Sequence, residues 1–354
     1  MKTLRKAAIF TDIHFGKKSN SPLHNEDCLR FIDWFCEQVQ ADPTIDHVVF
    51  MGDWNENRSS LNVATLNFSY QGAKKLNNLG LPLYFCVGNH DLYHRNTREV
   101  HSVVPFHEFT NFQIVDEPMI VSSIGNGVMF APYMFHHEYP ELKKYNSVPV
   151  WMGHFEFQGF LITGYNQRML TGPTVDLFQD VRRIFSGHFH KRQHQGNVHY
   201  IGNCFPMDFS DAGDTDRGMA TYDHETNKIV YINWDQAPQY LHVKLTDILD
   251  DKVIIPEQAR IKCAVDVAIN FEESAYLRQR FLEDYKLREF ALEESKELMD
   301  ALTETQTNIV GNDGQFRLDS VDDLVTQMLQ GINTDQIDNN MLIDIYRDLR
   351  VEAK

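Results

Sequence analysis

The chain has 354 residues, of which 42% are hydrophobic and 23% are charged, and its formal net charge is −17. This length accommodates one large domain and a smaller one, and no run of about 18 apolar residues is present, so no membrane-spanning helix is expected. The acidic balance disfavours a protein that coats nucleic acid through its own cations, because neutralising phosphates requires Lys and Arg. It leaves open a nucleic-acid enzyme whose site carries metal cations, and a count of 16 histidines favours such a metal site.

The five cysteines indicate a reducing environment. None of them forms a C-x-x-C pair, and an odd number in a chain of this length argues against a disulfide framework. The basic N-terminal residues precede an apolar run that Thr11, Asp12 and His14 interrupt, which indicates a first strand and not a signal peptide. We therefore expect a cytoplasmic protein with no membrane contact.

The first hundred residues alternate between strands and helices. Apolar runs predict strands at 4–11, 47–52 and 81–87, and apolar side chains at helical spacing predict amphipathic helices at 25–40 and 61–79. The order β-α-β-α-β predicts a partly parallel sheet.

Between residues 111 and 234 the pattern changes to short strands separated by Gly, Pro and Asn. The expected strands are 112–115, 119–123, 128–131, 148–153, 183–186, 198–202, 218–223 and 228–233. They predict a second, mixed sheet packed on the first, with helices outside. The fold class expected for residues 1–238 is therefore α/β, a sandwich of two mixed β-sheets flanked by helices.

A smaller α+β domain is expected over residues 239–295, after a boundary near Pro238. Its predicted elements are strands at 240–246, 260–269 and 286–292 and a helix at 274–285. Residues 296–317 are polar and poor in apolar side chains, which is typical of a linker. Two short amphipathic helices are predicted within 318–354, and periodicity alone favours equally that they pack back on this chain or that they dock a partner.

Five stretches share one pattern, in which an apolar strand is followed by a Gly or a tight turn and then by side chains that bind metals. The stretches are Ile9–His14, Val48–Asp53, Leu81–Asp91, Val150–His154 and Ile184–His190. In an open α/β sheet, ligands bind at the carboxyl ends of the strands, so these side chains are expected to converge. Each stretch alone has a structural explanation as a turn or a solvated strand end, but five in one chain favour a metal site.

The candidate metal ligands are two carboxylates, one amide and four imidazoles: Asp12, His14, Asp53, Asn89, His154, His188 and His190. This donor set exceeds one tetrahedral site and suits two ions that share a carboxylate. Oxygen together with imidazole suits Mn, Fe or Zn better than Ca. Two such ions about 3.5–4 Å apart can activate a water and hold a phosphoryl oxygen for in-line displacement. His90, next to Asn89, is placed to stabilise charge or to protonate the leaving oxygen.

These motifs resemble, in order and spacing, the signature set of the calcineurin-like metallophosphoesterases. The resemblance rests on Asp12–His14, Gly52–Asp53, Gly88–Asp91, Gly153–His154 and Gly187–His190. Within that family, the runs Gly153–Glu156 and Tyr200–Asn203 resemble the DNA double-strand-break nuclease subunits of the SbcCD and Mre–Rad type, most closely the recombination nucleases of T-even phages. The resemblance implies a metallophosphoesterase sandwich that binds two divalent ions, with Mn2+ as the expected metal.

The resemblance also implies a role for each candidate residue. One ion would bind Asp12, His14, Asp53 and His190, and the second would bind Asp53, Asn89, His154 and His188. His90 would be the acid or the transition-state stabiliser, and Asp91 would either orient it or be structural. Relatives carry Asp or His three residues after the bridging Asp; here that position is Glu56, whose longer carboxylate is able to hydrogen-bond His90.

The same resemblance implies a substrate and partners. The chain would be an exonuclease and endonuclease acting on double-stranded DNA ends and single strands, in DNA repair, recombination and replication. Residues 239–295 would be a DNA-recognition cap, residues 318–354 would dock an SbcC- or Rad-type coiled-coil ATPase subunit, and helices of the first half would form a homodimer. A phage-encoded chain would act in the host cytoplasm.

Two other functions remain open from the sequence. One is a phosphodiesterase or phosphatase that acts on nucleotides or phosphoproteins, and the other is a non-catalytic scaffold of a recombination complex. The presence of His90 argues against the scaffold. Basic residues near the motifs, among them Lys17, Lys18 and Arg192, either contact DNA phosphates or are solvated charges.

Overall fold

The structure is a computed structural model that describes residues 3–162, 167–267, 269 and 271–294. The chain divides into two compact units, residues 1–295 and 296–354. The second unit lies outside the described residues, and so do the predicted linker at 296–317 and the predicted helices within 318–354. In the part of the chain that is described, no helix has both the length and the apolar composition needed to cross a membrane.

The first sheet has the order β12-β11-β1-β2-β3-β4. Its strands are β1 (Lys6–Phe10), β2 (His47–Phe50), β3 (Leu83–Cys86), β4 (Phe112–Val115), β11 (Gly218–Asp223) and β12 (Lys228–Asn233). Strands β1 to β4 run parallel, whereas β11 is antiparallel to both of its neighbours. The expectation that 112–115, 218–223 and 228–233 belong to the second sheet is therefore wrong. An apolar pattern predicts that a strand exists, but backbone pairing between distant segments decides which sheet it joins.

The second sheet has the order β5-β6-β7-β8-β10-β9. Its strands are β5 (Met119–Val121), β6 (Val128–Ala131), β7 (Val150–Gly153), β8 (Arg183–Ser186), β9 (Gln193–Gln195) and β10 (Val198–Tyr200). Strands β6, β7, β8 and β10 run parallel, and β5 and β9 are antiparallel edges. The sequence did not predict β9, because three polar residues at a sheet edge carry no apolar alternation.

The two sheets face each other across an apolar core. The rings of Tyr84 on β3 and Phe130 on β6 stack with centroids 4.2 Å apart. Successive side chains of a strand point to opposite faces, so Ile9 of β1 joins this inter-sheet core. Phe10 points the other way, and its ring lies 4.5 Å from that of Phe35 on α2.

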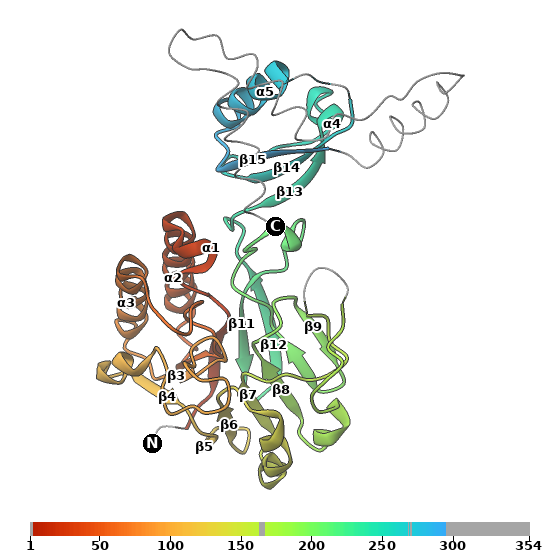
Figure 1. Ribbon diagram of the computed structural model, residues 1–354. Helices are drawn as coiled ribbons and strands as arrows, with labels where there is room; N and C mark the ends of the chain where they lie inside the picture. Colours follow the sequence, from red (N-terminus) through yellow and green to blue (C-terminus); the bar gives the residue numbers. More distant parts are fainter. Residues whose placement is uncertain (1–2, 163–166, 268, 270, 295–354) are drawn as a thin grey trace, which may run out of the picture. The chain divides into compact units, whose positions relative to one another are not determined.

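Helices α2 (Pro22–Ala41) and α3 (Val63–Asn77) pack on the outer face of the first sheet, close to the predicted ranges (Figure 1). The predicted fold class is thus confirmed: α/β, with two mixed sheets flanked by helices. The shorter helices are α1 (Lys17–Asn20) and four 3-10 helices, η1 (Val104–Glu108), η2 (His136–Tyr145), η3 (Val175–Phe178) and η4 (Phe209–Asp211).

The region after the sandwich forms a third sheet with the order β13-β14-β15. Its strands are β13 (Tyr240–Lys244), β14 (Arg260–Val265) and β15 (Glu289–Glu294), and its helices are α4 (Leu245–Leu249) and α5 (Phe271–Asp284). All three strands run parallel, and parallel strands need a crossover connection. Helix α5 lies within the connection from β14 to β15, and the sequence did not predict α4.

Candidate metal centre

The seven candidate ligands lie in loops that follow the carboxyl ends of β1, β2, β3, β7 and β8. Among the residues that the structure describes, three groups of His and Asp side chains have ligand atoms within 4.8 Å of one another: Asp12, His14 and His190; His14, Asp53 and His90; and Asp53, His154 and His188. Residues that are up to 178 positions apart in the chain thus meet at one end of the sandwich, as expected for ligands at the carboxyl ends of parallel strands.

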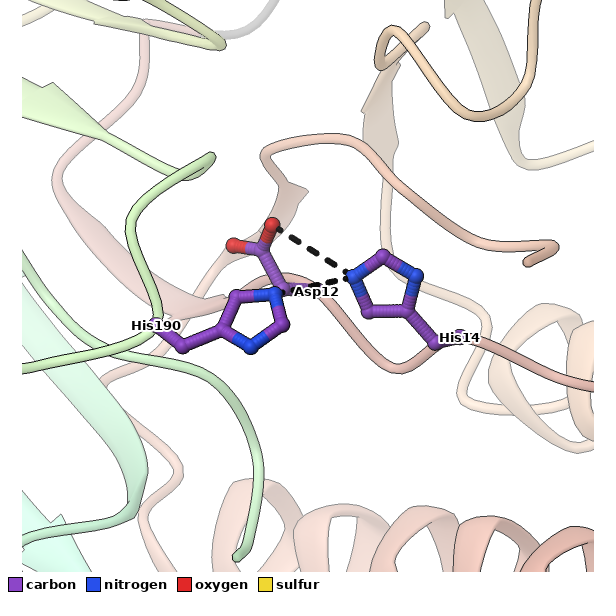
Figure 2. A group of neighbouring side chains, drawn as sticks. All are labelled: Asp12, His14 and His190. Carbon is purple, nitrogen blue, oxygen red and sulfur yellow. Dashed lines mark hydrogen bonds and ion pairs between the residues drawn. The ribbon is translucent and has the colours of Figure 1, made fainter. Parts of the chain in front are cut away.

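The first group brings β1 and β8 together. His14 Nε2 lies 3.1 Å from His190 Nε2 and 3.9 Å from Asp12 Oδ1 (Figure 2). Asp12 and His14 are at most 1% exposed, and burial raises the pKa of Asp12. Two ring nitrogens and a buried carboxylate that point at a common place are the donors that a divalent cation requires.

Asp53 lies between this group and the next. Its Oδ2 atom is 3.8 Å from His14 Nε2 and 3.4 Å from His154 Nε2. Burial lowers the pKa of His154, but the Asp53 carboxylate, with smaller contributions from Asp12 and the Met51 carbonyl, outweighs burial and raises that pKa to about 9. A carboxylate in this position is able to serve both ligand groups.

Asn89 lies against the group formed by Asp53, His154 and His188. Its Oδ1 atom lies 2.9 Å from His154 Nε2 and 3.0 Å from His188 Nδ1. The other nitrogen of His154, Nδ1, is 2.6 Å from the carbonyl oxygen of Met51, which only accepts hydrogen bonds. With a pKa of about 9, the ring of the metal-free chain also carries a proton on Nε2, which faces the Asn89 oxygen. A metal ion would take the place of this proton between the imidazole nitrogen and the amide oxygen, so this donor set fits a cation.

Several of the candidate ligands have a strained backbone conformation. Asp12, His14, Asp53 and His188 have φ of 52°, 53°, 62° and 90°. Residues with side chains rarely adopt this left-handed region, and such strain persists where the surrounding structure enforces it, often at functional sites. Gly88 lets Asp53 approach, because a Cβ at Gly88 would overlap the Asp53 backbone nitrogen.

Asp91 is fully buried and binds backbone, not the ring of His90. Its carboxylate accepts N–H bonds from Gly88 at 2.9 Å, from Trp54 at 3.0 Å and from Asn55 at 3.0 Å. Burial and the charge of Asp53 raise the pKa of Asp91 to about 7. These contacts correspond to the structural alternative for Asp91, since they hold the loop that carries Asp53.

Glu56 contacts a different histidine from the one expected. Its Oε2 atom lies 2.7 Å from His14 Nδ1 and 3.8 Å from His90 Nδ1. His90 Nδ1 is instead 2.9 Å from the backbone carbonyl of Glu56, and the backbone N–H of His90 donates to Asp53 at 2.8 Å. The side chain of His90 is 34% exposed, so it is accessible to a substrate beside the buried groups.

Three residues that contact the candidate ligands were not predicted to do so. Arg217 is 2% exposed and donates to the backbone carbonyl of His190, and His24 Nε2 lies 2.9 Å from the backbone carbonyl of His14. Glu156 lies 3.0 Å from His188. Its place two residues after His154 marked a resemblance, but no periodicity in the sequence indicates any of these contacts.

The basic residues near the site have partners within the chain. Lys18 Nζ lies 4.5 Å from the centre of the Tyr240 ring, and Arg192 lies 4.4 Å from the centre of the Tyr231 ring. Lys17 Nζ is 4.0 Å from Glu56 Oε1. These positions are near the ligands, but their side chains already take part in intramolecular contacts.

Comparison with known proteins identifies the family of the chain. The family model for calcineurin-like phosphoesterases matches residues 5–192, more than half of the chain. The chain is 28% identical over 185 residues to exonuclease subunit 1 of Enterobacteria phage T4, and the match covers 51% of this chain and 54% of that protein. The chain therefore aligns with about half the length of that relative.

Two solved structures are distantly similar to this chain. An archaeal phosphodiesterase has 14% identity and a TM-score of 0.36, covering 65% of this chain and 99% of its own. The nuclease MPE of Pseudomonas putida has 15% identity and a TM-score of 0.31, covering 63% of this chain and 87% of its own. The assignment does not depend on these distant likenesses: on the family match, the chain belongs to the calcineurin-like phosphoesterases, which are metal-dependent hydrolases of phosphoesters.

Proposed function

We propose that this chain is the nuclease subunit of a DNA-processing complex and cleaves phosphodiester bonds with two divalent ions. Mn2+ is the proposed metal, because the donor set combines oxygen and imidazole ligands. The observation that carries the proposal is the position of Asp53 between two ligand groups, with the accessible ring of His90 beside them. The match to a phage exonuclease subunit supports DNA as the substrate.

The proposed ligand sets are those expected from the sequence. One ion binds Asp12, His14, Asp53 and His190, and the other binds Asp53, Asn89, His154 and His188. When bound, such a pair supplies Lewis-acid activation of water and neutralises charge on the phosphoryl group. Asp12 and Asp53 are at most 2% exposed, and burying two neighbouring carboxylates is costly unless cations compensate their charge.

His90 is the proposed acid or charge stabiliser. The Glu56 carbonyl accepts from its Nδ1 atom, which leaves Nε2 free to act on a substrate, and the side chain is 34% exposed. Burial lowers the pKa of His90. In this assignment Asp91 shapes the loop that carries Asp53, and Glu56 holds the rings of His14 and His90 in place.

The proposed partners are DNA and an ATPase subunit, as the resemblance to nuclease subunits implies. Residues 239–295 act as a DNA-recognition cap, and residues 318–354 dock a coiled-coil ATPase subunit; the latter segment lies outside the described residues. The complex acts in double-strand-break processing and recombination. All five cysteines are unpaired, which supports a cytoplasmic location, in the host cell if the gene belongs to a phage.

A homodimer through α2 and α3 is also proposed. Val63, Leu66 and Tyr70 on α3 are 82%, 42% and 47% exposed, and their spacing places them on one helix face. An exposed apolar stripe of this kind is typical of an interaction surface. Sedimentation of the Leu66→Glu variant should show a monomer where the unchanged chain sediments as a dimer.

The decisive experiment is cleavage of linear DNA by the purified chain with Mn2+, compared with the His90→Ala variant. Loss of an acid–base group typically costs about 10²–10⁴-fold in rate, and Mn2+ binding should persist. Undiminished cleavage by the variant would reject the role of His90. Turnover of a simple phosphate monoester or of a cyclic nucleotide, but not of DNA, would indicate the phosphodiesterase or phosphatase alternative, and no turnover at all would indicate a scaffold.

A further inference from the structure

We propose that Glu156 is a positioning residue of the metal centre, which orients His188 so that Nδ1 of that ring binds the second ion. This inference rests on the proposed function, because it concerns one of the two ion sites assigned there. Glu156 is not among the metal ligands or catalytic residues that the sequence predicts.

The argument begins with the two nitrogens of the His188 ring. Nε2 lies 3.0 Å from Glu156 Oε2, and Nδ1 lies 3.0 Å from Asn89 Oδ1. An ionised carboxylate only accepts hydrogen bonds, so the neutral ring carries its proton on Nε2. Nδ1 then presents a lone pair toward Asn89, in the group that also contains His154. A carboxylate behind a ligating imidazole fixes the tautomer and the ring orientation and increases the basicity of the ligand.

The side chain and the backbone of Glu156 also contact a neighbouring helix. Its Oε1 atom lies 2.7 Å from Nε2 of His136, and its backbone N–H donates to the hydroxyl of Tyr139 at 2.8 Å. Both partners belong to η2. The side chain of Glu156 is 12% exposed.

A purely structural role makes a different prediction. If Glu156 only fastened η2 to the loop after β7, its important contacts would be those with His136 and Tyr139, and its loss would affect folding without selecting one ion site. Glu138 offers a matched control in the same helix. Its carboxylate accepts from Arg98 at 2.6 Å and from the backbone N–H of Phe135 at 2.8 Å, and within the described part of the chain it does not contact the candidate metal ligands.

The test is calorimetric titration of the full chain with Mn2+ alone, together with electron paramagnetic resonance of the bound ions. The unchanged chain should bind two ions with the spectrum of a spin-coupled pair. In Glu156→Ala, affinity for one ion should fall about 10–100-fold, as for the loss of other outer carboxylates, while the first ion binds normally and gives the spectrum of isolated Mn2+. Glu156→Gln, which keeps an acceptor oxygen, should lose less, and Glu138→Ala should bind both ions.

The outcomes separate this inference from the function on which it rests. Two wild-type affinities in Glu156→Ala would overturn it, and so would an equal loss at the same site in Glu138→Ala. If Glu156→Ala fails to fold, Glu156→Gln decides the question. The inference would be overturned if that variant had wild-type Mn2+ affinities, an unaltered spectrum and a wild-type pH dependence of Mn2+ binding. An unchanged chain that binds no Mn2+ would instead overturn the proposed metal centre.

Discussion

Nδ1 of His14 lies 2.7 Å from the carboxylate of Glu56, on the side of the ring opposite the ligand group. Burial lowers the pKa of His14, but the contact with Glu56 and the negative charges of Asp53 and Glu56 together outweigh it, and the pKa lies above its ordinary value. A carboxylate at this position directs the other ring nitrogen, Nε2, toward Asp12 and His190.

Replacing Glu56 by Gln should therefore weaken the first ion site. We expect a loss of Mn2+ affinity of up to about 10-fold, at the low end of what outer carboxylates contribute, because Gln keeps an acceptor oxygen but loses the negative charge. Calorimetric titration measures it, with Glu141→Gln as the control because Glu141 is exposed. Equal affinities in the two variants would show that Glu56 does not support His14.

Asp91→Asn should destabilise the fold. The carboxylate accepts backbone N–H bonds from Gly88, Trp54 and Asn55, and an amide keeps only one acceptor oxygen. At least one buried N–H then loses its acceptor, at a cost of about 1–3 kcal/mol. The midpoint of urea unfolding of the metal-free chain measures this. Asp176→Asn, at an exposed position, should leave the midpoint unchanged. An unchanged midpoint in Asp91→Asn would contradict the structural role of Asp91.

Asp27→Ala should lower the free energy of unfolding more than Asp33→Ala, a change on the same helix, α2. The Asp27 side chain is 1% exposed, both of its oxygens lie 2.7 Å from Arg288 Nη1, and Arg260 Nη2 is 3.4 Å away. Its loss leaves two largely buried guanidinium groups without that carboxylate, and breaking a buried pair costs about 3–5 kcal/mol.

The matched variant for this test is Asp33→Ala, also on α2. Asp33 pairs with Lys75, and both side chains are at least 40% exposed, so the loss should be at most about 1 kcal/mol. Urea unfolding compares the two variants. Similar losses would show that Asp27 is no more important to stability than a surface carboxylate.

Stability should fall as the pH decreases from about 6.5 toward 4. Burial lowers the pKa of His224 to about 3 and that of His199 to about 4. The folded chain keeps both rings neutral, whereas the unfolded chain protonates them near their ordinary pKa of about 6.5. The unfolded state therefore binds more protons in this window, so stability is fully present above it and is lost on acidification.

Urea unfolding of the metal-free chain at several pH values measures this dependence. His224 lies beside His47, Asp46 and Asp223. In His224→Phe the slope of the unfolding free energy should decrease by about 1.4 kcal/mol per pH unit within the window, because one such group titrates in the unfolded state only. An identical slope in the variant would show that His224 does not remain neutral in the folded chain.

The fold class and the position of the candidate site were predictable because both depend on local patterns. Apolar runs identify β1, β2 and β3, and helical spacing identifies α2 and α3. A Gly or a tight turn at the end of a strand, followed by Asp, Asn or His, marks a strand end at which polar groups gather. The shared direction of parallel strands then brings those ends to one edge of the sheet.

What the tertiary structure alone decided are pairings between segments that no local pattern relates. The sheet that β4 and β11 join depends on backbone hydrogen bonds with β3 and with β1 in the same sheet, and β12 follows β11 as its antiparallel neighbour. The contacts of Glu56 with His14 and of Glu156 with His188 depend on side-chain directions that folding sets, since a carboxylate is able to hydrogen-bond any donor that the packed chain places within its reach. Sequence determines which groups are available at the strand ends; packing determines which of them touch.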